Sequence, residues 1–356
     1  MSSNIKEQKR RERPVHGCYQ LAFRSDARIT RLPPKSIDVI VTSPAYWQKR
    51  DYGHKKQIGL EKTSDQYIDS IISVIENWKS CLKPTGSVFL NVGDSYSNGR
   101  LLEIPSRIAA EATKLGWKLR QRIIWEKPNG TPHSANRRLA AREEYVFHFT
   151  RSDKYYFDLE GYKQKYGGVS NIWRISPSLH KGEHLAPFPE ELVERILTLA
   201  CPIAVCSKCG QPYERVVAKT ALLDESRPQA KRAMAIAREA GLSDAHIAAI
   251  QAVGISDAGK AIRYQNGAGK NGAGVQKLAA EAKKVLGGYF REFTFAKKQT
   301  VSWRRCSCNA AAEPGVIFDP FVGTGTSLRA ASKLGVSAIG SDIKFYKHLK
   351  DFFALE

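Results

Sequence analysis

Two short stretches of the chain combine residue types whose order could support chemistry. The first is Asp-Pro-Phe-Val-Gly-Thr-Gly-Thr at 319–326, which follows an apolar run and precedes Ala-rich helical sequence. Glycines in such a strand-to-helix turn let backbone N–H groups approach a ligand closely. A second strand at 337–342 ends in Asp342, whose carboxylate could accept hydrogen bonds from ribose hydroxyls. Together these features predict a site for an adenosine-type ligand.

The second stretch lies near the other end of the chain, where the sequence reads Thr-Ser-Pro-Ala-Tyr-Trp at 42–47. It follows Ile-Asp-Val-Ile-Val, the pattern of a buried strand. The strand ends at a rigid proline turn that presents two aromatic side chains.

Together the two stretches resemble those of the amino-group DNA methyltransferases, which use S-adenosylmethionine. In that family the catalytic tetrapeptide is usually Ser-Pro-Pro-Tyr or Asp-Pro-Pro-Tyr, and the cofactor loop is Asp-Pro-Phe-x-Gly-x-Gly-Thr. Here the catalytic motif precedes the cofactor motif, an order similar to the permuted beta group. Ala45 stands where the family has its second proline. The resemblance implies a doubly wound, mainly parallel, Rossmann-like α/β sheet, a double-stranded DNA partner and, in some relatives, a cognate restriction endonuclease.

The resemblance also implies how the catalytic residues would act. An exocyclic amino nitrogen is a poor nucleophile until acceptors hold its hydrogens, and the Ser43 hydroxyl and the Pro44 carbonyl can be those acceptors. Tyr46 would stack on a base taken out of the duplex. Methyl transfer is then an in-line displacement that depends mainly on positioning and needs no metal.

In the family, members with serine at the first motif position mostly act on cytosine N4, whereas members with aspartate there mostly act on adenine N6. Ser43 therefore favours cytosine N4 as the target. Three alternatives stay open at this point. The first is methylation of adenine N6 in DNA, and the second is methylation of structured RNA. The third is a DNA-binding protein whose catalytic function has decayed, an alternative suggested by Ala45. Retention of the motif residues argues against decay; they are Ser43, Tyr46, Asp319, Gly323, Gly325 and Asp342.

The remaining cofactor candidates follow from the same resemblance. Asp26 follows a strand candidate at 18–23, where the family has the floor beside the adenine, and 187–189 matches the segment beside the methionine end. The full predicted set is Asp26, Pro187, Phe188, Pro189, Asp319, Pro320, Phe321, Gly323, Gly325, Thr326 and Asp342.

Alternating strand and helix patterns must position these motifs, and they indicate a parallel sheet. The expected strands are 37–42, 87–92, 119–126, 144–150, 316–319 and 337–342, and the expected helices are 60–82, 101–116 and 190–200. The expected domains are a disordered basic arm at 1–14, a methyltransferase domain at 15–200 and 314–356, and an inserted DNA-recognition subdomain at 201–313. Within the insertion, 229–240 and 243–253 predict two short helices, either a helix-turn-helix or a helical hairpin.

DNA contacts are expected from basic and aromatic residues near the catalytic turn, in the loop 127–142 and on the first insertion helix. The alternative for the loop is an ordinary solvated basic segment. The candidates are Trp47, Arg50, Arg137, Arg138, Arg227, Lys231, Arg232 and Arg238.

Four of the seven cysteines form two close pairs, Cys206 with Cys209 and Cys306 with Cys308, at the two ends of the insertion. Four thiolates so placed could bind one tetrahedral Zn²⁺ and clamp the base of the insertion. The alternative is reduced, unliganded cysteines, because disulfides are rare in a cytosolic protein.

Charge and composition limit the classes of function. The net charge of +21 and the isoelectric point near 9.7 favour a polyanionic partner such as nucleic acid, without separating DNA from RNA. No apolar stretch reaches the roughly 18 residues that a membrane span needs, and the N-terminus has no signal-peptide pattern. The sequence therefore predicts a cytoplasmic protein, prokaryotic or phage-encoded, without a membrane partner.

Overall fold

The chain forms two compact units in a computed structural model that describes residues 17–29, 31–128, 137–177, 188–225, 227–254, 271–344, 349 and 354–355. The first unit comprises Met1–Glu214 and Arg304–Glu356, and the second comprises Arg215–Trp303. The second unit is narrower than the insertion expected at 201–313. The flanking segments belong to the first unit, where β9 (Val205–Cys206) pairs with β12 (Ala312–Glu313).

Some predicted features lie outside the described residues. They are the basic arm at 1–14, Pro187, and residues 129–136 of the basic loop.

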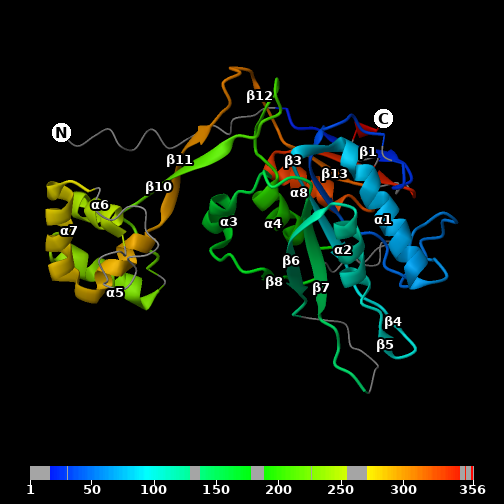
Figure 1. Ribbon diagram of the computed structural model, residues 1–356, viewed down its shortest axis with the longest axis horizontal. Coiled ribbons are helices and arrows are strands. Elements are labelled where there is room, and N and C mark those ends of the chain that lie inside the picture. The colour runs from blue at the N-terminus through cyan, green and yellow to red at the C-terminus, as the bar shows by residue number, and fades with distance from the viewer. Residues whose placement is uncertain are drawn as a thin grey trace. The chain divides into compact units, whose positions relative to one another are not determined.

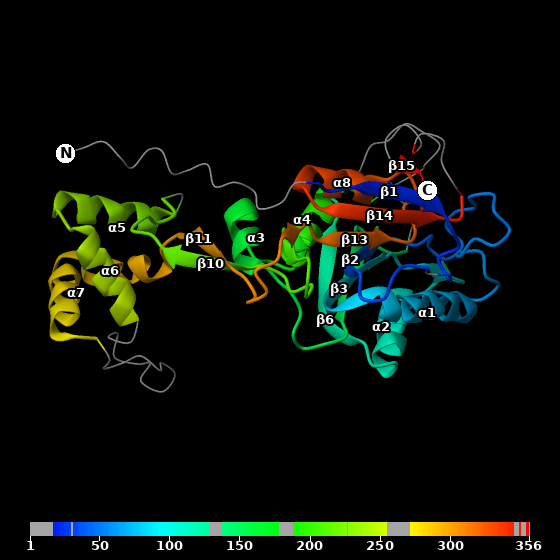
Figure 2. The ribbon, with the colours of Figure 1, turned by 90° about the horizontal axis from the view of Figure 1, so that it is seen from above.

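The first unit is built on one large sheet whose described strands run in the order β15-β1-β14-β13-β2-β3-β7-β6-β8. The bounds are β1 Gln20–Arg24, β2 Ile37–Thr42, β3 Leu82–Val92, β6 Lys118–Glu126, β7 Glu143–Thr150, β8 Ile172–Arg174, β13 Val316–Asp319, β14 Ser337–Asp342 and β15 Ala354–Leu355. Only β7 runs antiparallel to its neighbours among these strands. The mainly parallel α/β sheet predicted from the sequence is therefore confirmed (Figures 1 and 2).

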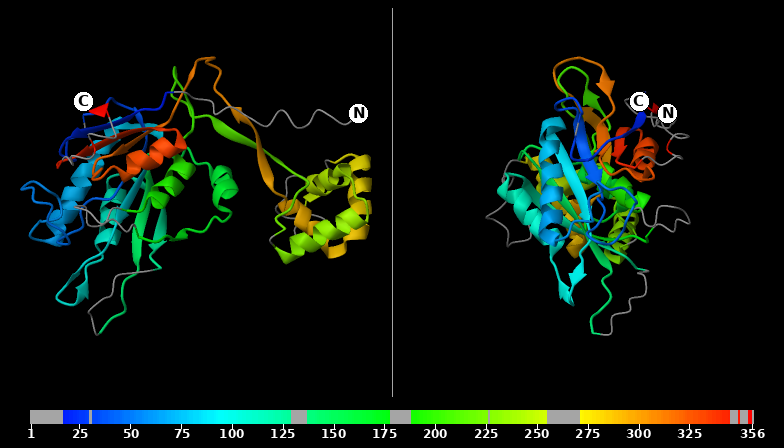
Figure 3. Two further views of the ribbon diagram at one scale, coloured as in Figure 1. Left: turned by 180° about the vertical axis from the view of Figure 1, so that it is seen from behind. Right: turned by 90° about the vertical axis from the view of Figure 1, so that its right-hand side faces the viewer.

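Helices cover both faces of this sheet, as Figure 3 shows from two further sides. On one face lie α1 (Ser64–Cys81) and α2 (Ile104–Lys114), and on the other lie α4 (Glu190–Ala200) and α8 (Thr326–Leu334), with α3 (Leu159–Tyr166) beside α4. The apolar residues of α1 recur every three or four positions, so a single stripe of the helix is buried against the sheet. Thr63 begins this helix by accepting a hydrogen bond from the backbone N–H of Gln66 at 3.2 Å.

The sheet register brings the two sequence motifs to one edge. β13 pairs in parallel with β2, so the turn after Thr42 and the loop after Asp319 leave the sheet side by side. Asp38 on β2 links this strand to both of its neighbours. Its buried carboxylate accepts hydrogen bonds from the Val316 N–H on β13 at 2.9 Å and from Lys83 Nζ on β3 at 2.7 Å. Burial raises the pKa of Asp38, whereas the Lys83 ammonium opposes that rise.

The second unit is mainly helical. It contains β10 (Glu214–Lys219) paired with β11 (Lys298–Arg304), followed in the chain by α5 (Pro228–Glu239), α6 (Asp244–Val253), α7 (Ala273–Leu286) and the 3-10 helix η2 (Gly287–Phe295). The two expected helices are confirmed as α5 and α6. The strands and α7 were not expected, because neither strand contains a buried residue or shows a clear apolar alternation.

A small core holds the second unit together. Its centre contains Ala233, Met234, Ile250, Ala282 and Phe293, which come from all three α-helices and from η2. Small alanine side chains of this core lie among larger Leu, Ile, Met and Phe side chains. The smaller strand pair β4 (Tyr96–Ser97) and β5 (Arg100–Leu101) belongs to the first unit.

In the described part of the chain, no helix is long and apolar enough to cross a membrane.

Candidate active site

Two adjoining hollows open at the edge of the sheet where β2 and β13 end. The smaller is lined by carboxylates and apolar side chains, among them Asp26, Asp342, Ile58, Pro320 and Phe321. The larger is a cavity of about 550 Å³. Four residues line both hollows: Ser43, Ala45, Tyr52 and Phe321. The predicted catalytic turn therefore lies between the two.

Buried contacts hold the predicted catalytic turn in place. Pro44 is buried, and the Tyr67 hydroxyl donates a hydrogen bond to the Ala45 carbonyl at 3.0 Å. Gly59 packs tightly against the same residue, since an added Cβ there would lie 3.2 Å from the Ala45 Cβ. A small residue at position 45 therefore fits its surroundings closely.

A hydrogen-bond network holds the Tyr46 hydroxyl. It donates to Glu144 Oε2 at 2.5 Å and accepts from Asn91 Nδ2 at 2.8 Å. Burial, with the negative charge of Glu144, raises the pKa of Tyr46 well above its ordinary value of 10.0. Tyr46 is therefore a neutral phenol at any physiological pH.

The same network reaches Ser43. Its hydroxyl lies 3.3 Å from Tyr46 Oη and 3.3 Å from Asn91 Nδ2. Because a carboxylate can only accept, the 2.9 Å contact of Asn91 Nδ2 with Glu144 Oε2 fixes which way the asparagine amide points. Glu144 also forms an ion pair with Lys127, whose ammonium lies 4.7 Å from the centre of the Trp125 ring.

Gly93 determines where the Tyr46 ring can lie. A Cβ added at this position would approach Tyr46 Cε2 to 2.6 Å, so the ring packs directly on the glycine. Tyr46 and Gly93 both line the larger cavity.

Asn91, Gly93 and Glu144 were not among the residues predicted from the sequence. Asn91 and Glu144 lie near the ends of β3 and β7, which are neighbours in the sheet. One available signal was an acidic pair at 143–144 that opens an otherwise apolar strand. The pairing of β3 with β7, which brings these residues to Tyr46, is not visible in the sequence.

Asp319 requires a correction. It was expected to bind the cofactor, but it is 1% exposed and its carboxylate is occupied within the protein. Oδ1 accepts from Thr42 Oγ1 at 2.6 Å and from the Phe321 N–H at 3.0 Å, while Oδ2 accepts from Ser327 Oγ at 2.6 Å. Asp319 therefore connects the loop 320–325 to β2 and to α8, and it lines neither hollow.

The glycine loop itself lines the larger cavity through Val322, Gly323, Thr324 and Thr326. Gly323 and Gly325 have φ values of 52° and 81°, a backbone region that favours glycine. Gly325 lines neither hollow and instead precedes α8 as its N-cap.

Polar groups and an aromatic side chain complete this end of the cavity. The buried Thr324 hydroxyl has no hydrogen-bond partner among the described residues. Phe188 lines the same cavity, and the buried Pro189 caps α4. The structure thus places Phe188, but not Pro189, at the cavity wall.

The two predicted acidic residues both line the smaller hollow. Asp342 accepts hydrogen bonds from the Gly323 N–H through Oδ2 and from the Lys344 N–H through Oδ1, each at 3.0 Å. Burial raises the pKa of Asp342. Asp26 pairs with Arg28 through both oxygens, and these hydrogen bonds lower its pKa although burial opposes them.

Trp47 was expected at the DNA but is buried. It is 8% exposed, lies in the core beside α1, and donates its indole N–H to the Glu61 carbonyl at 3.0 Å. Burial of this large ring stabilises the core, and its N–H already has a partner, so neither is available to DNA. Trp47 is therefore a packing residue.

The other expected DNA residues of the first unit either line the larger cavity or are exposed to solvent. Arg50 lines the larger cavity, and its buried Nη1 has no hydrogen-bond partner among the described residues. Arg137 and Arg138 are exposed, and the Arg138 guanidinium lies 3.7 Å from the centre of the Tyr96 ring.

The four candidates of the second unit are all exposed on α5 or at its start. Arg227 and Arg238 are ion-paired with Glu292 and Glu225 at 2.8 and 2.7 Å. Lys231 and Arg232 carry charge that none of the ion pairs found in the described residues neutralises.

The chain matches a family model within its first unit, and it also matches individual known proteins. Residues 37–203 match the model of a family described as DNA methylase, the N6/N4 amino methyltransferases. The chain is 33% identical over 207 residues to the type II methyltransferase M.Cfr9I of Citrobacter freundii, a match over 48% of this chain and 69% of that protein. It is 32% identical over 213 residues to M.SmaI of Serratia marcescens, over 49% of this chain and 73% of that protein.

A solved structure agrees in fold. The cytosine-N4-specific PvuII DNA methyltransferase superimposes with a TM-score of 0.52 at 14% identity, covering 92% of this chain and 82% of that one. The chain belongs to the N6/N4 DNA methylase family.

Proposed function

We propose that the protein transfers a methyl group from S-adenosylmethionine to an exocyclic amino group of a base in double-stranded DNA, at cytosine N4. The observation that carries this proposal is that Ser43, Ala45 and Phe321 line both hollows. A donor held in the smaller hollow would therefore meet an acceptor base in the larger cavity at the catalytic turn.

The residues of the smaller hollow fit an adenosine. Ile58 and Phe321 offer apolar surface for a purine, and the carboxylates of Asp26 and Asp342 can accept from hydroxyl and amino groups. The glycine loop suits the polar methionine end, as does the Thr324 hydroxyl, which no described residue engages in a hydrogen bond at the larger cavity. When bound, the cofactor supplies an electrophilic methyl group on a sulfonium.

The turn 43–46 would prepare the target amine. The Ser43 hydroxyl and the Pro44 carbonyl accept its hydrogens, which frees the nitrogen lone pair for displacement at the methyl carbon. Tyr46, held by Asn91 and Glu144, presents a neutral ring for stacking on the base. This intact network argues against a decayed enzyme.

Cytosine N4 is preferred over adenine N6 because serine occupies the first motif position. Adenine N6 is the alternative target within the same site. The two targets are distinguished by the product: N4-methylcytosine and N6-methyladenine differ in mass and retention.

The DNA partner is supported by charge. The chain carries a net charge of +21, and Arg50 places a guanidinium in the larger cavity. We propose that the second unit reads the DNA sequence through α5 and that Arg137 and Arg138 grip the backbone beside the extruded base. Because its named relatives are type II methyltransferases, we propose a cytoplasmic modification enzyme that protects sites from a cognate endonuclease.

One experiment tests the reaction. The purified chain is incubated with S-adenosylmethionine and unmethylated genomic DNA, and the digested nucleosides are separated and weighed. We expect N4-methylcytosine in the wild type and none with Ser43→Ala. N6-methyladenine instead would overturn the choice of base, and the absence of any methylated base from the DNA would overturn the proposed substrate.

A second experiment tests the sequence reader. Residues 215–303 are exchanged for the insertion of a relative that has another target, and the methylated sites are mapped. The proposal requires the modified sequence to change with the insertion. If the original site is still methylated, the second unit only grips the backbone.

A further inference from the structure

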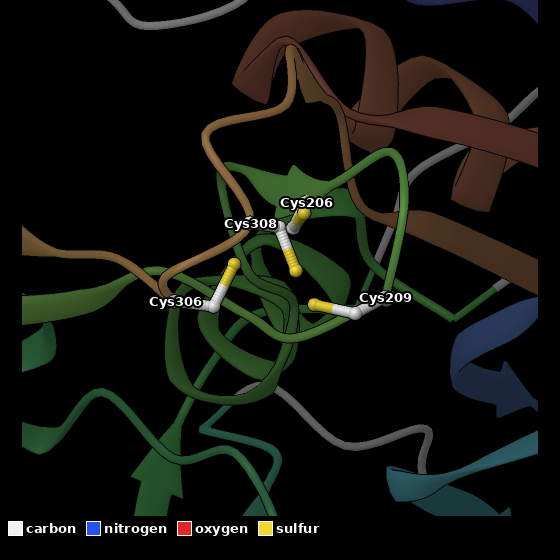
Figure 4. A group of neighbouring side chains, drawn as sticks. All are labelled: Cys206, Cys209, Cys306 and Cys308. Carbon is white, nitrogen blue, oxygen red and sulfur yellow. The ribbon is translucent and has the colours of Figure 1, made fainter.

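The four cysteines predicted from spacing converge in the first unit. The Sγ atoms of Cys206, Cys209, Cys306 and Cys308 all lie within 4.8 Å of one another. Figure 4 shows the four side chains directing their sulfurs into one common space from two separate segments of chain. All four are free cysteines, so no disulfide competes for these sulfurs.

The first pair lies on a tight turn. The Cys206 carbonyl accepts from the Gly210 N–H at 2.8 Å, and the Cys206 N–H donates to the Gln211 carbonyl at 2.9 Å. Gly210 has φ of 69°, which lets the chain reverse immediately after Cys209. Both sulfurs of the pair thereby leave the turn on the same side.

The second pair is brought to the first by a short ladder. β9 and β12 pair antiparallel with Ala312 opposite Cys206, and the Ser207 N–H donates to the Ala311 carbonyl at 3.0 Å. These bonds fix the segment that follows Cys308 beside the turn that holds Cys209. The arrangement is thus built by backbone contacts, not by chance approach of flexible side chains.

We propose that these four thiolates bind one structural Zn²⁺. Zinc prefers four tetrahedral ligands, and four sulfurs around a common centre provide a closed site with no position open for catalysis. Four thiolates around Zn²⁺ carry a net charge of −2. The adjoining sequence supplies three positive side chains that can offset this charge, namely Lys208, Arg304 and Arg305.

The position of the site determines its role. Cys206 and Cys209 lie just before the second unit in the chain, and Cys306 and Cys308 lie just after it. No residue of 207–212 or 304–313 is buried, so these two segments have no apolar core of their own. The metal therefore supplies cohesion that a hydrophobic core would otherwise provide, and it joins the two chain segments that lead into and out of the second unit.

Metal content tests the proposal without reference to methylation. Full-length chain is purified without chelators and analysed by mass spectrometry for metals, and we expect about one zinc per chain. Cobalt added to the apoprotein should give the intense visible bands of a tetrahedral thiolate site. Cys209→Ser should lose stoichiometric zinc, while Cys18→Ser, an exposed cysteine outside the cluster, should retain it.

Limited proteolysis provides a second readout. After zinc removal we expect cleavage first at 207–212 and 304–311, with the sheet residues 37–42 and 87–92 still protected. Because it uses the wild-type chain, this test holds even if Cys209→Ser fails to fold. Wild-type protein with no zinc, with iron in its place, or with an unchanged cleavage pattern after metal removal would overturn the proposal.

Discussion

The hydroxyl of Thr42 donates a 2.6 Å hydrogen bond to the carboxylate of Asp319, two residues that are 277 positions apart in sequence. Thr42 immediately precedes the proposed catalytic turn, and Asp319 begins the proposed cofactor loop. One buried contact thus couples the position of the proposed methyl acceptor to that of the proposed methyl donor.

Asp319 should make stability depend on pH. Burial raises its pKa from the ordinary value of 3.8 to about 6. The folded state therefore holds this proton more tightly than the unfolded state does, so the stability that this group contributes is lost as pH rises from about 4 to 6. We expect Asp319→Asn to reduce that loss, measured by urea unfolding at several pH values. Asp69→Asn, an exposed control, should behave as the wild type; equal slopes for all three proteins would contradict the assignment.

Removal of the carboxylate charge at Asp342 should weaken cofactor binding. Asp342→Asn keeps the side-chain size but replaces a charged acceptor by a neutral one, so we expect an affinity loss of roughly 10- to 100-fold. Isothermal calorimetry with S-adenosylmethionine measures the change, and Asp69→Asn again serves as the control. Unaltered affinity would show that Asp342 does not contact the cofactor.

Glu144→Gln should slow methyl transfer more than it weakens binding. The substitution removes the ion pair with Lys127 and the strong acceptor for Tyr46, which lets the ring shift. We expect kcat to fall roughly 10- to 100-fold with the cofactor affinity unchanged. Glu126→Gln, at the end of the neighbouring strand β6 and outside both hollows, should leave kcat unchanged. A fall of the same size in the control would mean that charge loss alone is responsible.

A methyl group at Gly93 should displace the Tyr46 ring. Gly93→Ala places its Cβ 2.6 Å from Tyr46 Cε2, a contact that real structures avoid, so the ring must move. We expect lower methylation activity and a stability loss of about 1–3 kcal/mol. At Gly168 an added Cβ meets nothing within 4 Å, so Gly168→Ala is the matched control. Full activity of Gly93→Ala would show that the position of the ring is unimportant.

The exposed cations of α5 should contribute to DNA affinity. If Lys231 and Arg232 each neutralise one phosphate, the joint substitution Lys231→Ala and Arg232→Ala should reduce the slope of log K against log salt by about 2. The control changes Lys114 and Lys118 to Ala. Lys118 is the first residue of β6 and Lys114 ends the preceding helix α2, and β6 begins at the end of the sheet that lies opposite the site. Equal slopes in wild type and the α5 variant would remove α5 from the interface.

The sequence by itself determined the two motifs, the alternating strands and helices, and the cysteine pairs. These features are local: a strand followed by a glycine turn, a proline after a buried run, and two thiols a few residues apart are each visible in a short window. The helices α4, α5 and α6 were predicted for the same reason, since their apolar periodicity and flanking residues lie within the segments themselves.

Only the tertiary structure decided which of these residues face the hollows. Asp319 and Trp47 have the residue types of ligand contacts, yet buried partners such as Thr42 and the Glu61 carbonyl occupy them. Asn91 and Glu144 reach Tyr46 only because β3 and β7 pair in one register, and strand pairing between distant segments leaves no local trace in sequence. The direction of a side chain is set by its neighbours in the fold, and those neighbours come from far along the chain.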